Sequence, residues 1–403
     1  MNRLILIGNG FDLAHNLKTS YEDFIYWYWE NRFYSFIGNG SNVSKDILCT
    51  LTSMAPWSVV YHNNSFYFGN SNGKELYKYL KDNPNKFHII FTPFFERIHH
   101  SIETKGWVDI EKEYYDLLEQ NSFANYSAKN IEELNNQLLY LQKQLTEYLT
   151  EINKEPIQVN DNIRKKIYAP IELSDIAVEA TQTLNNYIEW CNKQQDDYWK
   201  YVLTNYNINP IGSGLFYEVI DYKKDPLNHS VPEAYMLPQK IMLLNFNYTK
   251  TAEQYLNQNS GIFSHNQIHG VLDNPDSMIF GYGDEFEDKY KKLQNLNNNE
   301  CLKNIKTIRY LESDNYRKMH EFVESAPFQV IIMGHSCGNS DRTLLNTIFE
   351  HKNCVSIKPY FRKKGDNNDN YIELIQNISR NFTDMKLMRD RVVNKTYCKP
   401  LVG

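Results

Sequence analysis

Short apolar runs separated by glycine-rich turns open the chain. Residues 4–7 are continuously apolar, and Gly8-Asn9-Gly10 ends the run. An uninterrupted branched run of this kind is typical of a parallel strand buried on both faces. Residues 21–33 carry apolar positions at helical spacing, with acidic residues in the first turn, as expected where a helix begins. The opening pattern therefore predicts a strand, a glycine turn and a helix.

The same alternation returns in the last part of the chain. Residues 240–244 and 328–333 are apolar runs of the buried-strand type, and each is followed by a polar turn. Shorter strands are expected at 267–270, 278–281 and 355–357, and helices at 249–257, 342–350 and 371–378. We expect both ends of the chain to build one sheet, with residues 240–245 in the same sheet as residues 4–7.

Helical periodicity dominates the middle of the chain. Residues 85–120 and 172–201 have apolar positions at helical intervals, and leucines repeat every three to four residues between 134 and 145. Residues 37–76 are polar and predict few regular elements. We therefore predict an α/β fold with a Rossmann-like, mostly parallel sheet. The expected domains are a nucleotide-binding core of residues 1–84 and 206–403 and a helical insertion subdomain of residues 85–205.

Composition and charge narrow the classes of partner. With 41% hydrophobic and 23% charged residues, the 403-residue chain can form a substantial core. A net charge of −6 gives no basic excess, so nucleic acid is not supported as a partner. The six cysteines lie more than four residues apart, which removes the common zinc and redox motifs and is typical of reduced cytosolic thiols. No apolar run approaches the roughly 20 residues that span a bilayer. We expect a cytoplasmic protein with no membrane partner and no metal site.

Five polar or glycine-containing clusters each follow a predicted strand. In an open parallel sheet, ligands bind outside the carboxyl ends of the strands. We therefore expect the clusters to converge on one crevice. They are Gly8-Asn9-Gly10-Phe11-Asp12, Asn245-Phe246-Asn247-Tyr248, His269-Gly270, Gly281-Tyr282-Gly283 and Gly334-His335-Ser336.

Asn247 and His269 are the candidate catalytic pair. An asparagine amide can orient a hydroxyl or a water, and a histidine can accept a proton near neutral pH. A lone histidine is more often structural, and it is the strand-end position of both residues that favours function. Gly8-Asn9-Gly10 suits a phosphate, although Leu13 replaces the third glycine of the dinucleotide fingerprint, and a tight turn is the alternative. Asp12 is either a ribose or water contact or a turn-forming residue.

A rival site is the Gly334-His335-Ser336-Cys337-Gly338 turn, which has the spacing of a hydrolase nucleophile elbow between a strand and a helix. His351 is the only later histidine, and it lies too soon after Ser336 to suit a triad base. A packing or phosphate-binding turn is therefore favoured here.

A pair of carboxylates, Asp109 and Glu111, follows Trp107 at an expected helix start. We predict that one of them lines the crevice, within about 10 Å of His269, or roughly one Debye length. The alternative is an exposed helix start with acidic residues at its N-terminus.

The chain resembles the AbiH family of bacterial abortive-infection proteins. The opening match is Gly8-Asn9-Gly10-Phe11-Asp12-Leu13-Ala14-His15 with Lys18-Thr19-Ser20-Tyr21. It continues in order through Trp107-Val108-Asp109-Ile110-Glu111, Asn245-Phe246-Asn247-Tyr248-Thr249, Ile268-His269-Gly270 and Gly334-His335-Ser336. The resemblance covers nearly the whole chain, and it implies a role in defence against phage.

The order of these motifs also resembles sirtuin-like domains, which implies a sirtuin-like core with NAD as ligand or substrate. By that similarity the chemistry falls on Asn247 and His269. The implied NAD-binding residues are Gly8, Asn9, Gly10, Phe11, Asp12, His15, Tyr248, Gly270, Gly334, His335 and Ser336. The chain departs from sirtuins in having Tyr248-Thr249 where an acidic residue is usual, and in lacking the four-cysteine zinc site. Protein deacylation is therefore not expected.

The expected function is that of an anti-phage effector that binds NAD and cleaves its nicotinamide–ribose bond. One alternative is a nucleotide-binding sensor or scaffold without catalysis, and another is a hydrolase that depends on Ser336. A nucleotide is the expected small-molecule partner. A second copy of the chain and a phage-derived activator are the candidate macromolecular partners.

Overall fold

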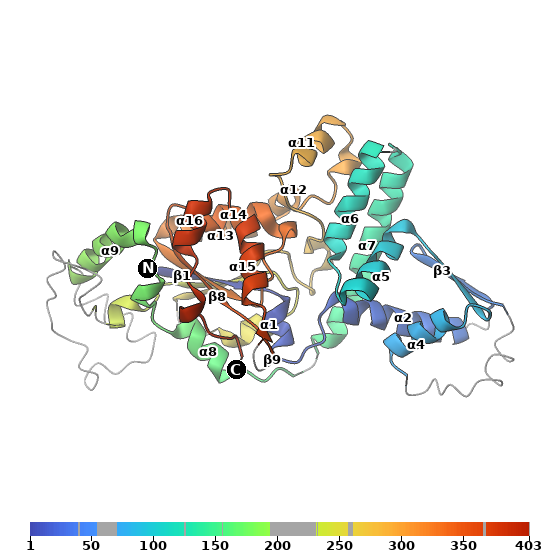
Figure 1. Ribbon diagram of the computed structural model, residues 1–403, viewed down its shortest axis with the longest axis horizontal. Helices are drawn as coiled ribbons and strands as arrows, with labels where there is room; N and C mark the ends of the chain where they lie inside the picture. Colours follow the sequence, from blue (N-terminus) through green and yellow to red (C-terminus); the bar gives the residue numbers. More distant parts are fainter. Residues whose placement is uncertain are drawn as a thin grey trace. The chain divides into compact units, whose positions relative to one another are not determined.

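The computed structural model describes residues 1–38, 41–54, 71–124, 126–154, 156–193, 231, 233–256, 261–365 and 368–402. The chain forms two compact units (Figure 1). Unit 1 contains Met1–Leu17, Pro156–Ile279 and Thr307–Gly403, and unit 2 contains Lys18–Glu155 and Phe280–Lys306. The domain limits expected from the sequence, 1–84 with 206–403 and 85–205, stay a prediction.

A five-stranded sheet forms the centre of unit 1, and every pairing in it is parallel. Its strands are β1 (Asn2–Ile7), β5 (Ile241–Asn245), β6 (Phe263–Gln267), β7 (Phe328–Met333) and β8 (Cys354–Tyr360). All residues of β1, β5, β7 and β8 are buried, as their continuous apolar sequences predict. Leu4 pairs with Met242 of β5 and Val330 of β7, so the prediction that both ends of the chain share one sheet is confirmed.

Helices cover both faces of this sheet, because successive strand residues point to opposite sides. Leu4 and Leu6 belong to one core cluster, and Ile5 and Ile7 belong to another. The first cluster includes α13 (Asn315–Ser325), α14 (Arg342–Phe349), α15 (Tyr371–Arg380) and α16 (Met385–Arg391). The second includes α1 (Asn9–Leu13), α8 (Asp161–Tyr168) and the 3₁₀ helix η6 (Thr251–Tyr255). Figure 1 shows α13 to α16 on one side of the strands and α1 and α8 on the other.

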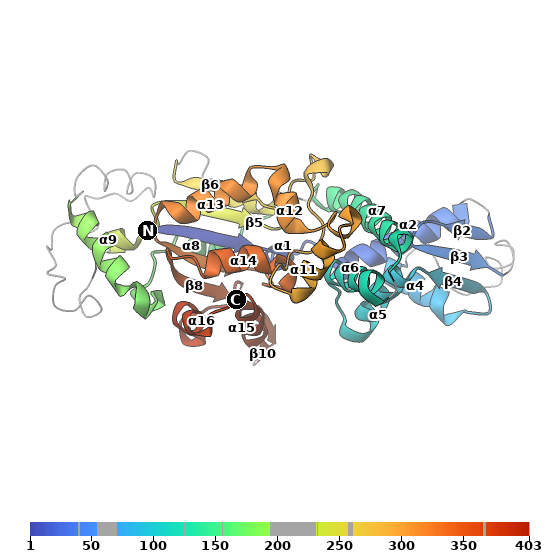
Figure 2. The ribbon, with the colours of Figure 1, turned by 90° about the horizontal axis from the view of Figure 1, so that it is seen from above.

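The strand order is β6-β5-β1-β7-β8, and it reverses direction at β1. From β1 the chain goes on to build β5 and β6 on one side, and then crosses over to build β7 and β8 on the other. In Figure 2 the labelled strands β6, β5 and β8 follow one another across the sheet, and the blue strand that starts at the N-terminus, β1, lies between β5 and β8. The connections that follow β1 and β7 therefore leave the sheet in opposite directions. The fold therefore places the turns after β1, β5, β6 and β7 along one edge.

Remaining elements of unit 1 lie at the ends of the sheet or beside it. They are α9 (Thr181–Lys193), the short strands β9 (Lys363–Gly365) and β10 (Asn368–Asp369), and 3₁₀ turns that include η7 (Pro275–Ser277) and η10 (Asn339–Asp341). No helix among the described residues is both long enough and apolar enough to cross a bilayer.

Unit 2 combines helices with a small antiparallel sheet in the order β2-β3-β4. Leu134, Leu138, Leu141 and Leu145 are all buried on one face of α7, which confirms the leucine periodicity. The helices are α2 (Tyr21–Gly38), α4 (Gly73–Asp82), α5 (Pro93–Lys105), α6 (Ile110–Glu119), α7 (Ala128–Ile152) and α11 (Asp288–Asn295), with α12 (Lys306–Arg309) at the unit limit. The strands are β2 (Val43–Lys45), β3 (Cys49–Ser53) and β4 (Phe87–Phe91).

Three expected elements differ in the structure. Residues 87–91 form β4 and not a helix, because Thr92 caps α5 only after the strand has ended. Residues 278–281 form no strand, since the chain leaves a 3₁₀ turn there and Tyr248 donates its hydroxyl hydrogen to the carbonyl of Ile279. Gly281 therefore belongs to unit 2 and not to the sheet edge. The helix expected at 249–257 is the 3₁₀ helix η6.

Candidate functional site

Three glycines allow the turn after β1 to touch the turn after β7. A Cβ on Gly8 would lie 2.5 Å from the Cα of His335, and a Cβ on Gly10 would lie 2.9 Å from the Cα of Gly334. Gly334 has a φ of 78°, and a Cβ there would lie 2.1 Å from the backbone nitrogen of Phe11. Only glycine tolerates both the positive φ and the close approach. These glycines therefore lock two neighbouring strand ends together.

The backbone amides of the first turn donate to carbonyls within unit 1. The N–H of Gly8 donates to Met333 at 3.3 Å, and that of Gly10 donates to Gly334 at 2.9 Å. The N–H of Phe11 donates to Gly8 at 2.8 Å. A phosphate cradle needs amides that point at the ligand, so the contact that the structure supports for these glycines is close packing. Phosphate binding at this turn stays a prediction.

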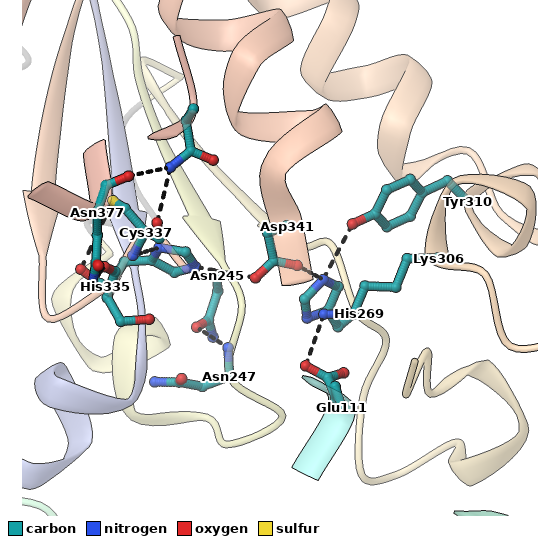
Figure 3. A network of polar contacts seen from close by, with 12 residues as sticks. Glu111, Asn245, Asn247, His269, Lys306, Tyr310, His335, Cys337, Asp341 and Asn377 are labelled. Carbon is teal, nitrogen blue, oxygen red and sulfur yellow. Dashed lines mark hydrogen bonds and ion pairs between the residues drawn. The ribbon is translucent and has the colours of Figure 1, made fainter. Parts of the chain in front are cut away.

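A carboxylate shared by two histidines lies at the same edge of the sheet (Figure 3). His269 follows β6, His335 follows β7, and Asp341 ends η10 just before α14. The Nε2 of His269 is 3.2 Å from Oδ1 of Asp341, and the Nε2 of His335 is 3.6 Å from Oδ2. These side chains are at most 9% exposed. The fold thus brings together two predicted residues around an aspartate that the sequence analysis did not single out.

Local contacts fix the orientation of both imidazole rings. The N–H of Cys337 donates to Nδ1 of His335 at 3.0 Å, so the hydrogen of the neutral ring lies on Nε2, facing Asp341. Cys337 has a φ of 55°, a left-handed conformation that is uncommon outside glycine. On the other ring, the Tyr310 hydroxyl lies 3.3 Å from Nε2 of His269. The ring of Phe246 packs against both histidines, with centroid distances of 5.3 and 4.0 Å.

A second polar group lies on the turns after β1 and β5. The Thr249 hydroxyl donates to Oδ2 of Asp12 at 2.6 Å, and Asp12 is 1% exposed. Burial raises the pKa of Asp12 to about 6, against the opposing effect of hydrogen bonding by Thr249, Thr251 and Asn247. The Oδ1 of Asp12 and the Nδ2 of Asn247 are buried atoms without a hydrogen-bond partner at normal distance. The Asn247 amide and the Asp12 carboxyl interact at neighbouring strand ends.

Several residues expected to bind a cofactor have structural contacts in unit 1. Phe11 is fully buried in the core, and the ring nitrogens of His15 lie 2.7 Å from the Phe11 carbonyl and 2.6 Å from the Tyr255 hydroxyl. The Tyr248 hydroxyl bonds a backbone carbonyl. Gly270 has a φ of 86° and forms a turn in which a Cβ would lie 2.2 Å from a carbonyl oxygen. Their part in ligand binding stays a prediction.

Ser336 and His351 lie at opposite ends of the strands in unit 1. Its side chain is exposed, and its carbonyl accepts from Asn377 at 2.9 Å. His351 precedes β8 and therefore lies toward the amino ends of the strands, where it pairs with Glu324 at 3.3 Å. Ser336 follows β7 at the carboxyl ends, so these two residues do not form a nucleophile–base pair.

Asp109 and Glu111 hold structural positions in unit 2. Asp109 caps α6 by accepting from the N–H of Lys112. Glu111 is buried and accepts at 3.0 Å from both the N–H of Gly281 and the ammonium of Lys306, whereas Trp107 is 59% exposed. The expected closeness of a carboxylate to His269 stays a prediction.

The residues that the sequence analysis missed are Asp341, Tyr310 and Thr249. Asp341 follows the Gly334–Gly338 turn at the start of a predicted helix, and that position was the available indication. Thr249 is the first residue of the helix expected at 249–257, and its hydroxyl donates to Asp12. Tyr310 lies in an irregular segment and had no distinguishing pattern. In the described part of the chain, no group of three or more His, Cys, Asp or Glu side chains has the arrangement of a metal site.

Comparison with known proteins gives one family-level result. The family model described as bacteriophage abortive infection AbiH matches residues 4–362, which include every strand-end residue discussed above. Comparisons with curated proteins and with solved structures give no significant match.

Proposed function

The chain belongs to the AbiH family of bacteriophage abortive infection proteins, and from that premise we propose that it acts by cleaving NAD at the nicotinamide–ribose bond. The observation that carries the proposal is the buried His269–Asp341 pair at the carboxyl edge of the parallel sheet. A histidine held by a carboxylate is a common arrangement for proton transfer near neutral pH.

The strand order supports a nucleotide as the ligand. In unit 1 the order reverses at β1, as it does in doubly wound sheets of the Rossmann type, where nucleotides bind at the reversal. We therefore propose a Rossmann-like, sirtuin-like nucleotide-binding sheet. Its ligand would contact the turns that carry Asp12, Asn247 and His269, because these turns leave the strands at the same edge.

The proposed reaction consumes water and yields nicotinamide, ADP-ribose and a proton. The bond between the ribose C1′ and the nicotinamide nitrogen breaks, nicotinamide leaves with the bonding pair, and a water oxygen bonds to C1′. His269 takes up a proton from a ribose hydroxyl or from the water. The Asp341 carboxylate stabilises the imidazolium that forms, and the Asn247 amide orients the attacked sugar or the water.

Nicotinamide release by the purified full chain tests the proposal. His269→Ala should lower the rate by about 10²–10⁴-fold, the usual range for removing a general acid–base group. Asp341→Asn should also lower it, and the double variant should be little worse than His269→Ala, because residues that act as a unit are not additive. His351→Ala is the matched control, since it removes a histidine of unit 1 at the opposite end of the strands.

Two outcomes decide against NAD cleavage. A folded His269→Ala protein that releases nicotinamide at the wild-type rate removes His269 from the mechanism. A wild-type protein that releases none, with and without lysate from phage-infected cells as activator, favours the sensor alternative. In that alternative the protein binds a nucleotide and acts through a partner.

A further inference from the structure

The turn between β7 and η10 contains a residue in a strained backbone conformation. Cys337 has a φ of 55°, a left-handed value that is uncommon for a residue with a side chain. Such conformations persist only where the surrounding contacts over-determine them, and they cluster at functional sites. The backbone N–H of Cys337 donates to Nδ1 of His335 at 3.0 Å (Figure 3). The strained residue therefore contacts a histidine of the candidate site directly.

Two asparagines at the end of α15 hold this turn by its carbonyl groups. Nδ2 of Asn381 donates to the carbonyl of Cys337 at 2.8 Å, and Nδ2 of Asn377 donates to that of Ser336 at 2.9 Å. Asn381 also donates to the carbonyl of Asn377 at 2.8 Å. Because both hydrogens of its Nδ2 are used, the direction of the Asn381 amide is fixed. We call Asn377 and Asn381 the asparagine clamp.

The clamp is anchored inside unit 1. Asn381 is fully buried, and its backbone carbonyl accepts from Nδ2 of Asn346 at 2.9 Å. Asn346 belongs to α14, the helix that directly follows Asp341. Oδ1 of Asn381 finds no donor in the described part of the chain, and a buried polar atom of this kind calls for an explanation. The donor side of the amide, which holds the turn, gives a reason for an asparagine at this position.

A short series of contacts connects the clamp to the proposed catalytic pair. Because the Cys337 N–H points at Nδ1, the hydrogen of the neutral His335 ring lies on Nε2, which is 3.6 Å from Oδ2 of Asp341. Oδ1 of the same carboxylate is 3.2 Å from Nε2 of His269. A carboxylate that faces two imidazole rings keeps its orientation only while both rings keep theirs. The turn at Cys337 therefore affects the carboxylate through His335.

We propose that Asn381 is a positioning residue, which holds the strained turn so that Nε2–H of His335 faces Asp341. Asn377 supports it from the preceding turn of α15. Through His335 the clamp orients the Asp341 carboxylate toward His269. The inference takes from the proposed function that His269 and Asp341 are the reacting pair, and it does not depend on the identity of the ligand.

Nuclear magnetic resonance tests the clamp without any reaction. A hydrogen bond from the Cys337 N–H to Nδ1 of His335 gives a scalar coupling between the two nitrogens, which is measured in full-length protein labelled with ¹⁵N-cysteine and ¹⁵N-histidine. The coupling should be present in the wild type and lost in Asn381→Leu, which removes the donor. Thermal melts establish that each variant is folded.

Asn353→Leu is the matched control. Nδ2 of Asn353 also donates to two carbonyls of unit 1, those of Val323 at 2.9 Å and Glu324 at 3.2 Å. Asn353 directly precedes β8 and so lies at the opposite end of the strands. Its replacement removes the same number of hydrogen bonds, and it should leave the coupling between Cys337 and His335 intact.

A glycine at the strained position separates the clamp from the packing of α15. Glycine adopts a positive φ without steric cost, so the turn should depend less on the clamp. In Asn381→Leu/Cys337→Gly, labelled with ¹⁵N-glycine and ¹⁵N-histidine, the coupling from residue 337 to His335 should return. If Asn381 only stabilised the end of α15, glycine at this position would not restore the contact.

Nicotinamide release measures the consequence for the proposed reaction. Asn381→Leu should lower kcat by about 10- to 100-fold, because a small misplacement of catalytic groups has an effect of this size. KM should stay near the wild-type value, since a fully buried side chain does not touch the ligand. Asn353→Leu should keep both constants.

The outcomes distinguish this inference from the proposed function. The positioning role is overturned if the wild type lacks the coupling, if the coupling survives Asn381→Leu, or if glycine does not restore it. Nicotinamide release that depends on His269 but is unchanged in Asn381→Leu overturns the positioning role alone. A coupling that depends on Asn381 in a protein that releases no nicotinamide refutes NAD cleavage and leaves the clamp standing.

Discussion

Replacing Asp12 with asparagine isolates the effect of burying its charge on stability. Burial raises the pKa of Asp12 to about 6 in the folded protein, against about 3.9 in an unfolded chain. Between these values the folded state binds more protons than the unfolded state. The free energy of unfolding of the wild type therefore falls as the pH rises through this window.

The size of the effect follows from the two pKa values. Over the whole window the ionisation of Asp12 lowers the free energy of unfolding by about 3 kcal/mol, at about 1.4 kcal/mol per pKa unit. Between pH 5 and pH 7 the fall is about 1.3 kcal/mol. Asp12→Asn carries no charge, so its stability relative to the wild type should improve by that amount. The new amide group can also change the stability by an amount that does not depend on pH, and this amount cancels when the difference between variant and wild type at pH 7 is compared with the difference at pH 5.

The measurement is urea unfolding at pH 5, 6 and 7, with hydrogen exchange of peptides from β1 as the probe. This probe reports the free energy of unfolding of unit 1. Thr249→Val is the companion variant: it keeps the carboxylate and removes a hydroxyl that lowers the pKa of Asp12, so it should move the fall to higher pH. A stability difference between wild type and Asp12→Asn that stays constant from pH 5 to pH 7 would falsify the assignment of a buried ionisable carboxyl here.

Other substitutions test packing and charge in the two units. Gly334→Ala should destabilise unit 1 by about 2 kcal/mol or more, because its φ is 78° and the Cβ meets backbone at 2.1 Å. Gly338→Ala is the control, because a Cβ there has its nearest neighbour at 3.7 Å, and its melting temperature should equal that of the wild type. Equal melting temperatures for Gly334→Ala and Gly338→Ala would contradict the close packing at Gly334. Glu111→Ala should destabilise unit 2 by about 3–5 kcal/mol, since it removes a buried carboxylate that is paired with the buried Lys306 ammonium at 3.0 Å. Lys306→Met in that background should recover part of the loss in urea titrations, and no recovery argues against the ion pair. Burial lowers the pKa of His99 to about 3, so between pH 7 and pH 5 the unfolded chain takes up a proton that the folded protein does not, and the free energy of unfolding of unit 2 should fall by about 2 kcal/mol. His99→Gln should lack this pH dependence. Identical pH profiles for the wild type and His99→Gln would refute the assignment of a buried, neutral His99.

Strands buried on both faces were the most predictable part of the fold. In β1, β5 and β7 every position is buried, and each strand contains a run of at least four consecutive apolar residues, which is easy to recognise in the sequence. β4 was harder, because residues 87–91 run directly into α5 and their apolar positions also fit helical spacing. The Thr92 cap separates the two elements, and a cap is a weak indication within a longer apolar stretch.

The candidate site was only partly predictable, for a physical reason. His269 and Asn247 follow apolar runs, so local pattern alone places them at strand ends. Asp341 was singled out only because its carboxylate lies close to the imidazoles of His269 and His335, which follow other strands. A local sequence pattern carries no information about such a long-range contact. The Gly8-Asn9-Gly10 turn shows the same limit, since a phosphate cradle and close packing demand the same residue. The partner that distinguishes them, Gly334, lies far along the chain.

The central position of β1 has a consequence for the timing of folding during synthesis. Arg3 of β1 pairs with Gln329 of β7, 326 positions later, and the glycine contacts that join the two turns span a similar separation. At about 5–20 residues per second, a ribosome needs on the order of tens of seconds between making these two strands. The segment 18–155, which supplies most of unit 2, emerges in that interval and can bury its own helices. Because β1 pairs with β7, the Asp341 carboxylate and the strand-end histidines come together only after β7 and the turn that follows it have been made. In an abortive-infection protein built this way, the candidate site stays unassembled until β7 and the turn after it have been synthesised.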